Sequence, residues 1–294
     1  MKRNFNSEQC TGCGNCLNVC PKNLLTFSDN LNSRGLPYIV LNHDSCLSCG
    51  LCALMCTAGA VWMAPDTQDN YDTFLRLDAI PPHRGCSLGI LGRLLAEVIH
   101  ELDIQKHVVL FGTSDVSLKC ESYVLSAPEC LDKALAYKLK NPGRIVICVY
   151  PDSKKPAHEA AVNRFSALRH ESITIIHTLN YFTQENDYQS PSSGASNILE
   201  QVQKLGYAGF IARSGVKNPR QVKLLKEFIW TALHCQIEGR PFSIVEMIFP
   251  CPYRLEGRPQ NPISPERLNF VKEWFAKEIE PSFPVGILIN DKGL

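Results

Sequence analysis

The run CTGCGNCLNVCP occupies residues 10–21, and the run CLSCGLCALMC occupies residues 46–56. Both have the spacing C-x2-C-x2-C-x3-C, so the second run repeats the first 36 residues later. Three thiolates on one tight loop can bind three irons of a cubane, while the fourth cysteine points away to a neighbouring cluster. The spacing predicts two 4Fe-4S clusters with exchanged fourth ligands. The predicted ligands are Cys10, Cys13, Cys16 and Cys56 for one cluster, and Cys46, Cys49, Cys52 and Cys20 for the other.

Zinc is the alternative metal, because it also binds paired C-x2-C motifs. Eight cysteines in two intact quartets, with no histidine among them, favour iron. The chain has 14 cysteines, and such a content in a small secreted protein would indicate disulfides. Eight of them lie within the first 56 residues at metal-type spacing, which predicts reduced thiolates instead.

Charge and hydropathy narrow the class of partner. The 30 Lys and Arg residues nearly balance the 29 Asp and Glu residues, so nothing favours nucleic acid or an anionic membrane as the main partner. The N-terminal MKRNFNSEQC has no apolar run of signal-peptide length, and no later segment approaches the length of a membrane span. A cytoplasmic protein is therefore expected.

The 294 residues divide into two unlike parts. We expect a small α+β ferredoxin-like domain at residues 1–65, with a hairpin around SRGLPYIV at residues 33–40. A polar linker is expected at residues 66–82, because this stretch ends in two prolines. A larger domain is expected at residues 83–294.

In the larger part, apolar runs alternate with segments of helical periodicity. Buried strands are predicted for HVVLFG, RIVICVY, SITIIHTLN, AGFIAR and FSIVEMIF. Helices are predicted at residues 88–102, 131–139, 158–168, 197–205, 220–237 and 264–279. This alternation predicts an α/β fold with a doubly wound, mostly parallel sheet, whose ligands bind beyond the carboxyl ends of the strands.

Two family resemblances follow from these motifs. Residues 5–63 resemble the bacterial two-cluster ferredoxins, although Thr57 follows Cys56 where Pro21 follows Cys20. From about residue 80, the chain resembles the thiamine-binding β subunit of the 2-oxoacid:ferredoxin oxidoreductases. That resemblance is carried by GCSLGILGRLLAEVIHELDI, by NPGRIVICVYPD with SITIIHTLN, by SPSS, and by GYAGFIARSGVKNPRQVKLLKEFIWTALHCQIEGRPFSIVEMIFPCP. It implies a thiamine-diphosphate-binding-like fold.

The second resemblance also implies a cofactor site. Thiamine pyrophosphate is bound in that family through Mg²⁺, which takes oxygen ligands. The matching positions are Asp152, Asn180 and, in the lid, Thr183. Pro151 and Ser153 replace the glycines that would let the backbone approach the diphosphate. Asp152 could instead cap a helix, Asn180 could form a turn, and the crevice could bind another nucleotide-like ligand.

A third cluster is a further implication of the resemblance. Cys86 and Cys251 match two of its ligands, and Cys120 lies near the position of another. Three positions differ from the family: His83 stands where a cysteine is expected, Asp115 stands where another is expected, and Leu88 stands where a histidine is expected. The alternative is that the three cysteines are small core thiols. Core positions are expected for Cys148 and Cys235, and Cys130 could have either role.

Two hypotheses of function remain. In the first, the chain is the iron-sulfur β-type subunit of a 2-oxoacid:acceptor oxidoreductase complex of anaerobic metabolism. It then requires an α-type and a γ-type partner subunit and is not catalytic alone. In the second, it is an electron relay and docking subunit of another redox complex, and it keeps the fold without thiamine. The oxo acid, the reduction potentials and the oligomeric state do not follow from the sequence.

Overall fold

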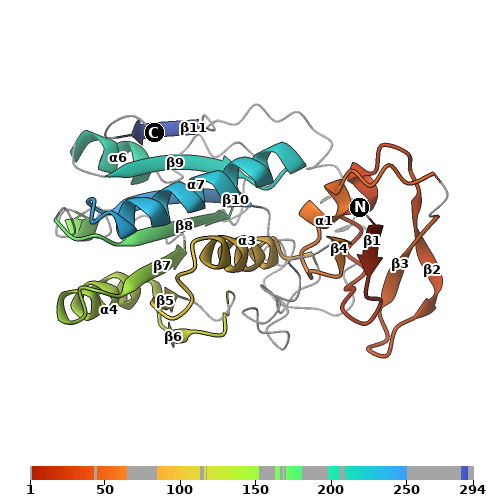
Figure 1. Cartoon of the computed structure of the whole chain (residues 1–294), viewed down its shortest axis with the longest axis horizontal. Helices are drawn as coiled ribbons and strands as arrows, with labels where there is room; N and C mark the ends of the chain where they lie inside the picture. Colours follow the sequence, from red (N-terminus) through yellow and green to blue (C-terminus); the bar gives the residue numbers. More distant parts are fainter. Residues whose placement is uncertain are drawn as a thin grey trace, which may run out of the picture.

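The computed structural model describes residues 2–42, 45–64, 85–112, 116, 118–151, 163–165, 168, 170–180, 198–205, 209–249 and 286–290. Figure 1 shows two parts side by side along the long axis of the molecule. The cysteine-rich N-terminal part forms one end, and a layered α/β part forms the other. The expected linker at residues 66–82 and the expected helices at residues 158–168 and 264–279 lie wholly or mostly outside the described residues.

The N-terminal part combines two small antiparallel sheets with two short helices. Strand β1 (Lys2–Phe5) pairs with β4 (Val61–Ala64), which brings the two ends of this part together. Strands β2 (Leu25–Leu31) and β3 (Pro37–Leu41) form a hairpin that contains the turn expected around residues 33–40. The short helices are η1 (Leu17–Val19) and α1 (Leu51–Leu54), which contact each other.

A seven-stranded sheet organises the larger part. Its strands are β5 (Val108–Gly112), β6 (Glu121–Val124), β7 (Ile145–Pro151), β8 (Thr174–Asn180), β9 (Phe210–Gly215), β10 (Ser243–Phe249) and β11 (Gly286–Asn290). Their order across the sheet is β11-β9-β10-β8-β7-β5-β6, and every neighbouring pair except β11 with β9 is parallel. The doubly wound, mostly parallel sheet is confirmed, and so are its five predicted strands. The edge strands β6 and β11 were not predicted, and the side chains of β6 are all exposed.

Helices cover both faces of this sheet (Figure 1). The helices α3 (Leu88–Glu101) and α7 (Pro219–Ile237) pack over one hydrophobic core. On the opposite face, α4 (Ala127–Lys140) and α6 (Ile198–Leu205) pack over a second core. Alternate residues of a strand enter the two cores, as the apolar runs predict: Ile147 and Val149 enter the first, whereas Val146 and Cys148 enter the second.

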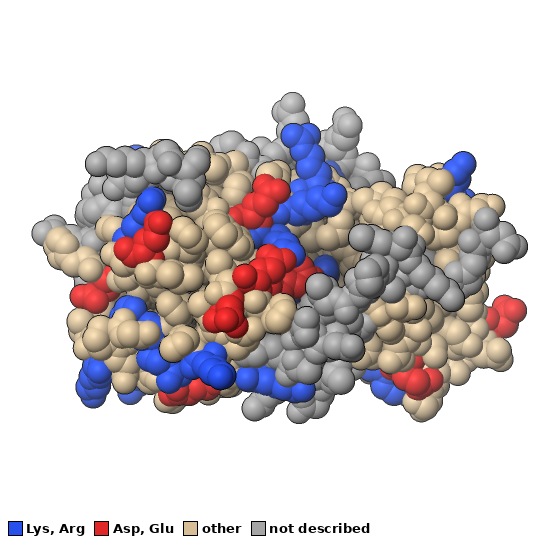
Figure 2. Space-filling model, in the orientation of Figure 1, with Lys and Arg blue, Asp and Glu red and all other residues tan. Residues whose placement is uncertain are grey.

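Helix α4 starts earlier than the periodicity predicts, because a capping box fixes its first turn. The side chain of Ser126 contacts that of Glu129 at 2.6 Å, and Glu129 in turn accepts from the backbone N–H of Ser126. Among the helices that the structure describes, none combines the length and apolar character needed to cross a membrane. Lys and Arg lie interspersed with Asp and Glu on the face in Figure 2, in agreement with the balanced composition.

A buried row of polar side chains crosses the middle of the sheet. Tyr150, His177, Glu246 and Arg213 are register partners on four adjacent strands, so they lie on one face. The Nδ1 of His177 lies 2.7 Å from one carboxylate oxygen of Glu246, and the Nε of Arg213 donates to the other. From α6, Glu200 accepts two hydrogen bonds from the same guanidinium, at 2.7 and 3.1 Å. The row therefore links three strands and one helix through buried hydrogen bonds and ion pairs.

Replacing Glu246 with Gln should destabilise the larger part strongly. Arg213, His177 and Glu246 have fully buried side chains, and removing one charge of a buried pair costs about 3–5 kcal/mol because its partner stays desolvated. Urea unfolding followed by circular dichroism measures the change. The control is Glu121→Gln, since the Glu121–Arg144 pair is about one third exposed and should cost less than about 1 kcal/mol. Equal effects of the two substitutions would contradict a structural role for the row.

Candidate functional site

Four cysteines line a first cavity in the N-terminal part. They are Cys10, Cys13, Cys16 and Cys56. Phe5, Ile39 and Val61 complete much of the wall, so the sulfurs lie in apolar surroundings. Three of the four cysteines are buried, and Cys13 is partly exposed. This cavity is therefore largely closed to solvent.

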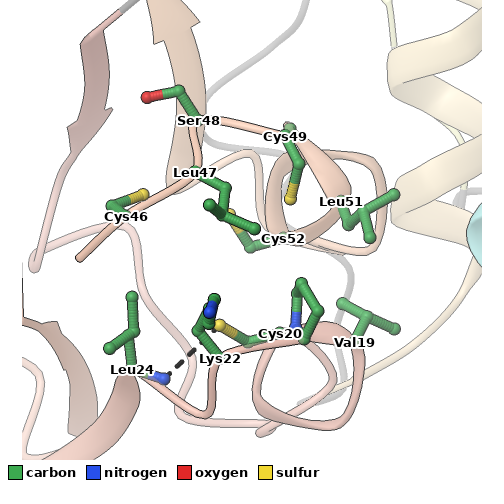
Figure 3. A pocket seen from close by; sticks show the side chains of 12 residues that line it. Val19, Cys20, Lys22, Leu24, Cys46, Leu47, Ser48, Cys49, Leu51 and Cys52 are labelled. Carbon is green, nitrogen blue, oxygen red and sulfur yellow. Dashed lines mark hydrogen bonds between the residues drawn. The ribbon is translucent and has the colours of Figure 1, made fainter.

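Four other cysteines line a second cavity. They are Cys20, Cys46, Cys49 and Cys52. Figure 3 shows Cys46, Cys49 and Cys52 on one side of this cavity and Cys20 on the opposite side. Of the four, Cys52 alone is buried and Cys49 is exposed, and the neighbouring Leu47 has 60% of its surface exposed. The second cavity is thus the more open one.

Two short helices carry cysteines from one cavity to the other. Helix η1 separates Cys16, in the first cavity, from Cys20, in the second. In the same way, α1 contains Cys52 of the second cavity and is followed by Cys56 of the first. Each cavity is therefore lined by three cysteines of one run and the fourth cysteine of the other.

Backbone amides near the cysteines are directed at sulfur. The N–H groups of Gly12 and Leu24 donate to the Sγ atoms of Cys10 and Cys20, each at 3.4 Å. The N–H of Ala60 donates to the Sγ of Cys56 at 3.2 Å. Hydrogen bonds of this kind stabilise thiolate ligands and raise the reduction potential of a bound cluster.

The donor chemistry fits an iron-sulfur cluster. Burial raises the pKa of Cys56 to about 11, and it also raises the pKa values of Cys10 and Cys16. Buried thiolates at such positions need a bound cation to be stable, and sets of four sulfurs suit iron-sulfur clusters or zinc. Among the residues that the structure describes, no three His, Cys, Asp or Glu side chains converge on one ion position. Each quartet instead surrounds a cavity.

The first cavity adjoins the larger part of the chain. Met55, which follows α1, is 1% exposed and belongs to the core beneath α3 and α7. Gly85, just before α3, has a φ of +74°, and a Cβ built on it would lie 3.1 Å from the Cβ of Cys13. Arg93 of α3 donates to the carbonyl oxygen of Leu54 at 2.7 Å. Arg93 was not predicted from the sequence, although a charge inside the apolar segment GILGRLLAEVI was a usable signal.

The structure describes only part of the thiamine-like site. Asp152, Thr183, and the side chain of Asn180 lie outside the described residues. The strands that lead to them are adjacent: β7 ends at Pro151, which pairs with Thr178 of β8, and β8 ends at Asn180. Arg213 of β9 is buried and paired with the carboxylates of Glu200 and Glu246, so its charge is already compensated.

The residues considered for a third cluster are also only partly described. Cys86 is 2% exposed in the core beneath α3, and Cys120 packs against the same core. Leu88 is buried there too. Cys251, His83 and Asp115 lie outside the described residues.

The remaining described cysteines are buried. Cys148 and Cys235 have no exposed surface, which confirms the core positions expected for them. Cys130 is equally buried, and its sulfur lies 2.9 Å from that of Cys148. Burial and the neighbouring Cys130 raise the pKa of Cys148, so its thiol stays protonated and unreactive.

Comparisons with known proteins agree with the sulfur geometry. Residues 9–60 match the family described as a 4Fe-4S dicluster domain. Over 52 residues, the chain is 33% identical to the ketoisovalerate oxidoreductase subunit VorC of Methanothermobacter marburgensis, covering 18% of this chain and 66% of that subunit. It is 42% identical over 48 residues to an uncharacterised ferredoxin of Methanocaldococcus jannaschii, covering 16% of this chain and 25% of that protein. Within the N-terminal part, residues 9–60 are therefore similar to 4Fe-4S dicluster domains.

A solved structure is also similar to this chain. It is the 2-oxoglutarate:ferredoxin oxidoreductase of Magnetococcus marinus, with 14% identity, a TM-score of 0.45, and coverage of 69% of this chain and 79% of that one. The curated relatives named above are matched over less than two thirds of their own length.

Replacing Gly85 with Ala should loosen the first cavity, because the new Cβ would press on Cys13 at a backbone geometry that L residues rarely adopt. The matched control is Gly35→Ala, where φ is +69° but nothing lies within 4 Å of the new Cβ. Both variants carry the backbone strain, of about 1 kcal/mol, and only the first adds the contact. Iron release to a chelator in mild urea should be several-fold faster for Gly85→Ala than for Gly35→Ala. Equal rates would show that residue 85 does not support the cavity.

Proposed function

We propose that this chain is the iron-sulfur, electron-transferring subunit of a 2-oxoacid:acceptor oxidoreductase-type complex. It binds one 4Fe-4S cluster through Cys10, Cys13, Cys16 and Cys56, and a second through Cys20, Cys46, Cys49 and Cys52. The observation that carries the proposal is that each quartet lines one cavity within a segment that matches a 4Fe-4S dicluster domain. The similarity to VorC, a subunit of a ketoisovalerate oxidoreductase, supports the class of complex.

The chain's own residues bind the clusters and control access to them. When bound, each cluster accepts and releases single electrons. The apolar wall of the first cavity excludes water, and the amides of Gly12 and Ala60 direct positive ends of dipoles toward its sulfurs. At the second cavity, exposed Leu47 and Cys49 leave a short path to a partner's redox centre. The second cavity is therefore where electrons are exchanged with a partner protein.

In this proposal the larger part carries thiamine pyrophosphate at the carboxyl ends of β7 and β8. Asp152 and Asn180 would hold Mg²⁺ through oxygen, and Thr183 would contribute from the lid. The adjacency of the two strands supports this placement, because Pro151 pairs with Thr178, two residues before Asn180. Thiamine would supply the chemistry for decarboxylating an oxo acid. The α-type and γ-type subunits would complete the reaction, so this chain alone would not be catalytic.

A second candidate function is an electron relay that lacks thiamine. Two features of the chain favour it. Pro151 stands where a glycine would let the backbone approach a diphosphate, and Leu88, in place of the family's histidine, is buried in the core beneath α3. In this version the α/β part serves to dock the clusters against another redox protein.

Anaerobically purified chain should contain about eight irons and eight acid-labile sulfides, or about twelve of each if Cys86, Cys120 and Cys251 support a third cluster. Zinc in place of iron would refute the proposal.

Cys20→Ala should remove or alter the cluster of the second cavity, so its electron paramagnetic resonance spectrum should match that of Cys49→Ala. The control is Cys16→Ala, which is nearer in sequence but lines the other cavity. A spectrum of Cys20→Ala that matched Cys16→Ala would reject the exchanged ligands.

Calorimetric titration with thiamine pyrophosphate and Mg²⁺ separates the two candidate functions. Binding that Asp152→Asn weakens at least tenfold is the expected result if the thiamine site is intact, because the metal then loses a charged ligand. The titration is made on the chain alone and on the chain with its copurified partners. Absence of binding in both preparations would exclude the thiamine site and support the electron relay.

A further inference from the structure

Arg93 is a buried cation at the junction of the two parts of the chain. It lies in the second turn of α3 and is 7% exposed. One guanidinium nitrogen donates to the carbonyl oxygen of Leu54 at 2.7 Å, and the other donates to Glu97 at 3.0 Å. Its Nε atom has no hydrogen-bond partner among the described residues. Because Leu54 is two residues before Cys56, the charge of Arg93 lies beside the wall of the first cavity.

A series of ion pairs leads from Arg93 to solvent. Glu97 also contacts Lys226 of α7 at 2.9 Å, and Lys226 contacts Glu101 at 2.7 Å. Side-chain exposure increases along this series of ion pairs, from 14% for Glu97 to 30% for Lys226 and 46% for Glu101. Water therefore screens the outer charges more than the inner ones. Lys226 also shares the negative charge of Glu97, which leaves the positive charge of Arg93 only partly compensated.

A further observation places this charge at the first cavity. The residues just before α3 reach the same cavity, since the space at Gly85 is bounded by Cys13. An arginine remains protonated even when buried, so the positive charge is permanent.

We infer that Arg93 raises the reduction potential of the cluster in the first cavity relative to the cluster in the second. The inference deepens the two-cluster proposal and rests on it. Reduction adds one electron, and so one negative charge, to a cluster, and a nearby buried cation stabilises that added charge. Because Arg93 belongs to α3, the α/β part itself influences the reduction potential of the cluster in the first cavity. Arg93 therefore favours the first cavity, beside the α/β part, as the position of an electron shared between the two clusters.

The test is a reductive titration of anaerobic full-length protein with dithionite and redox mediators, followed by electron paramagnetic resonance. Dithionite supplies one electron to each cluster. Arg93→Gln should lower the midpoint potential of the one cluster whose signal Cys56→Ala alters, and leave the other unchanged. Glu97→Gln should shift the same cluster in the opposite direction, because it removes the compensating charge. Arg93→Lys should retain most of the wild-type potential, and Glu101→Gln should have little effect.

Iron content, measured on every variant, shows whether a variant has lost a cluster or has only a shifted midpoint potential. Unchanged potentials in Arg93→Gln at full iron content would overturn the inference, and so would equal shifts of both clusters. If Arg93→Gln lost iron, Glu97→Gln would decide: an upward shift confined to the first cluster supports the inference, and no shift overturns it. A wild-type chain without iron would instead refute the two-cluster proposal itself, and the inference with it.

Discussion

The exchange of cysteines between two cavities is the constraint on which the N-terminal part depends. Each cavity is closed only when Cys20 or Cys56 reaches it from the other run. The 25 residues between Cys20 and Cys46 must therefore bring the second cysteine run back beside the first. The hairpin of β2 and β3 reverses the chain direction in this segment. The pairing of β1 with β4 then joins the two ends. A domain this small has little apolar core of its own, so bound metal clusters supply folding energy that packing cannot.

The two cavities differ because only one of them meets the rest of the molecule. Met55 and Leu54 pack against the core beneath α3 and α7, and Arg93 bonds to the backbone at the same point. The first cavity consequently has low exposure and a nearby positive charge, whereas the second keeps Cys49 and Leu47 at the surface. This asymmetry follows from attachment to the α/β part and not from the two cysteine runs, which have the same spacing. The same motif thus acquires two environments.

Much of this arrangement could be predicted from the sequence, for reasons that can be stated residue by residue. Ile147, Val149 and their neighbours are apolar on both faces, a pattern that parallel strands between two helical layers require. The cysteine spacing likewise predicted which residues share a cavity. What could not be predicted depends on tertiary contact: β6 is short and exposed, so it has no apolar signal. Arg93, Glu246 and Arg213 acquire their partners only when distant segments meet.

The buried row in the sheet offers a physical reason for the α/β fold to be stable without a bound cofactor. Glu246 joins His177 and Arg213 at the same level of three parallel strands, and Glu200 fixes α6 to that level. These bonds hold the strands in register independently of any group bound beyond their carboxyl ends. Pro151, at the end of β7, pairs with Thr178 and is not part of the row. The sheet can therefore support the junction with the first cavity, through α3 and α7, whether or not the crevice holds a cofactor.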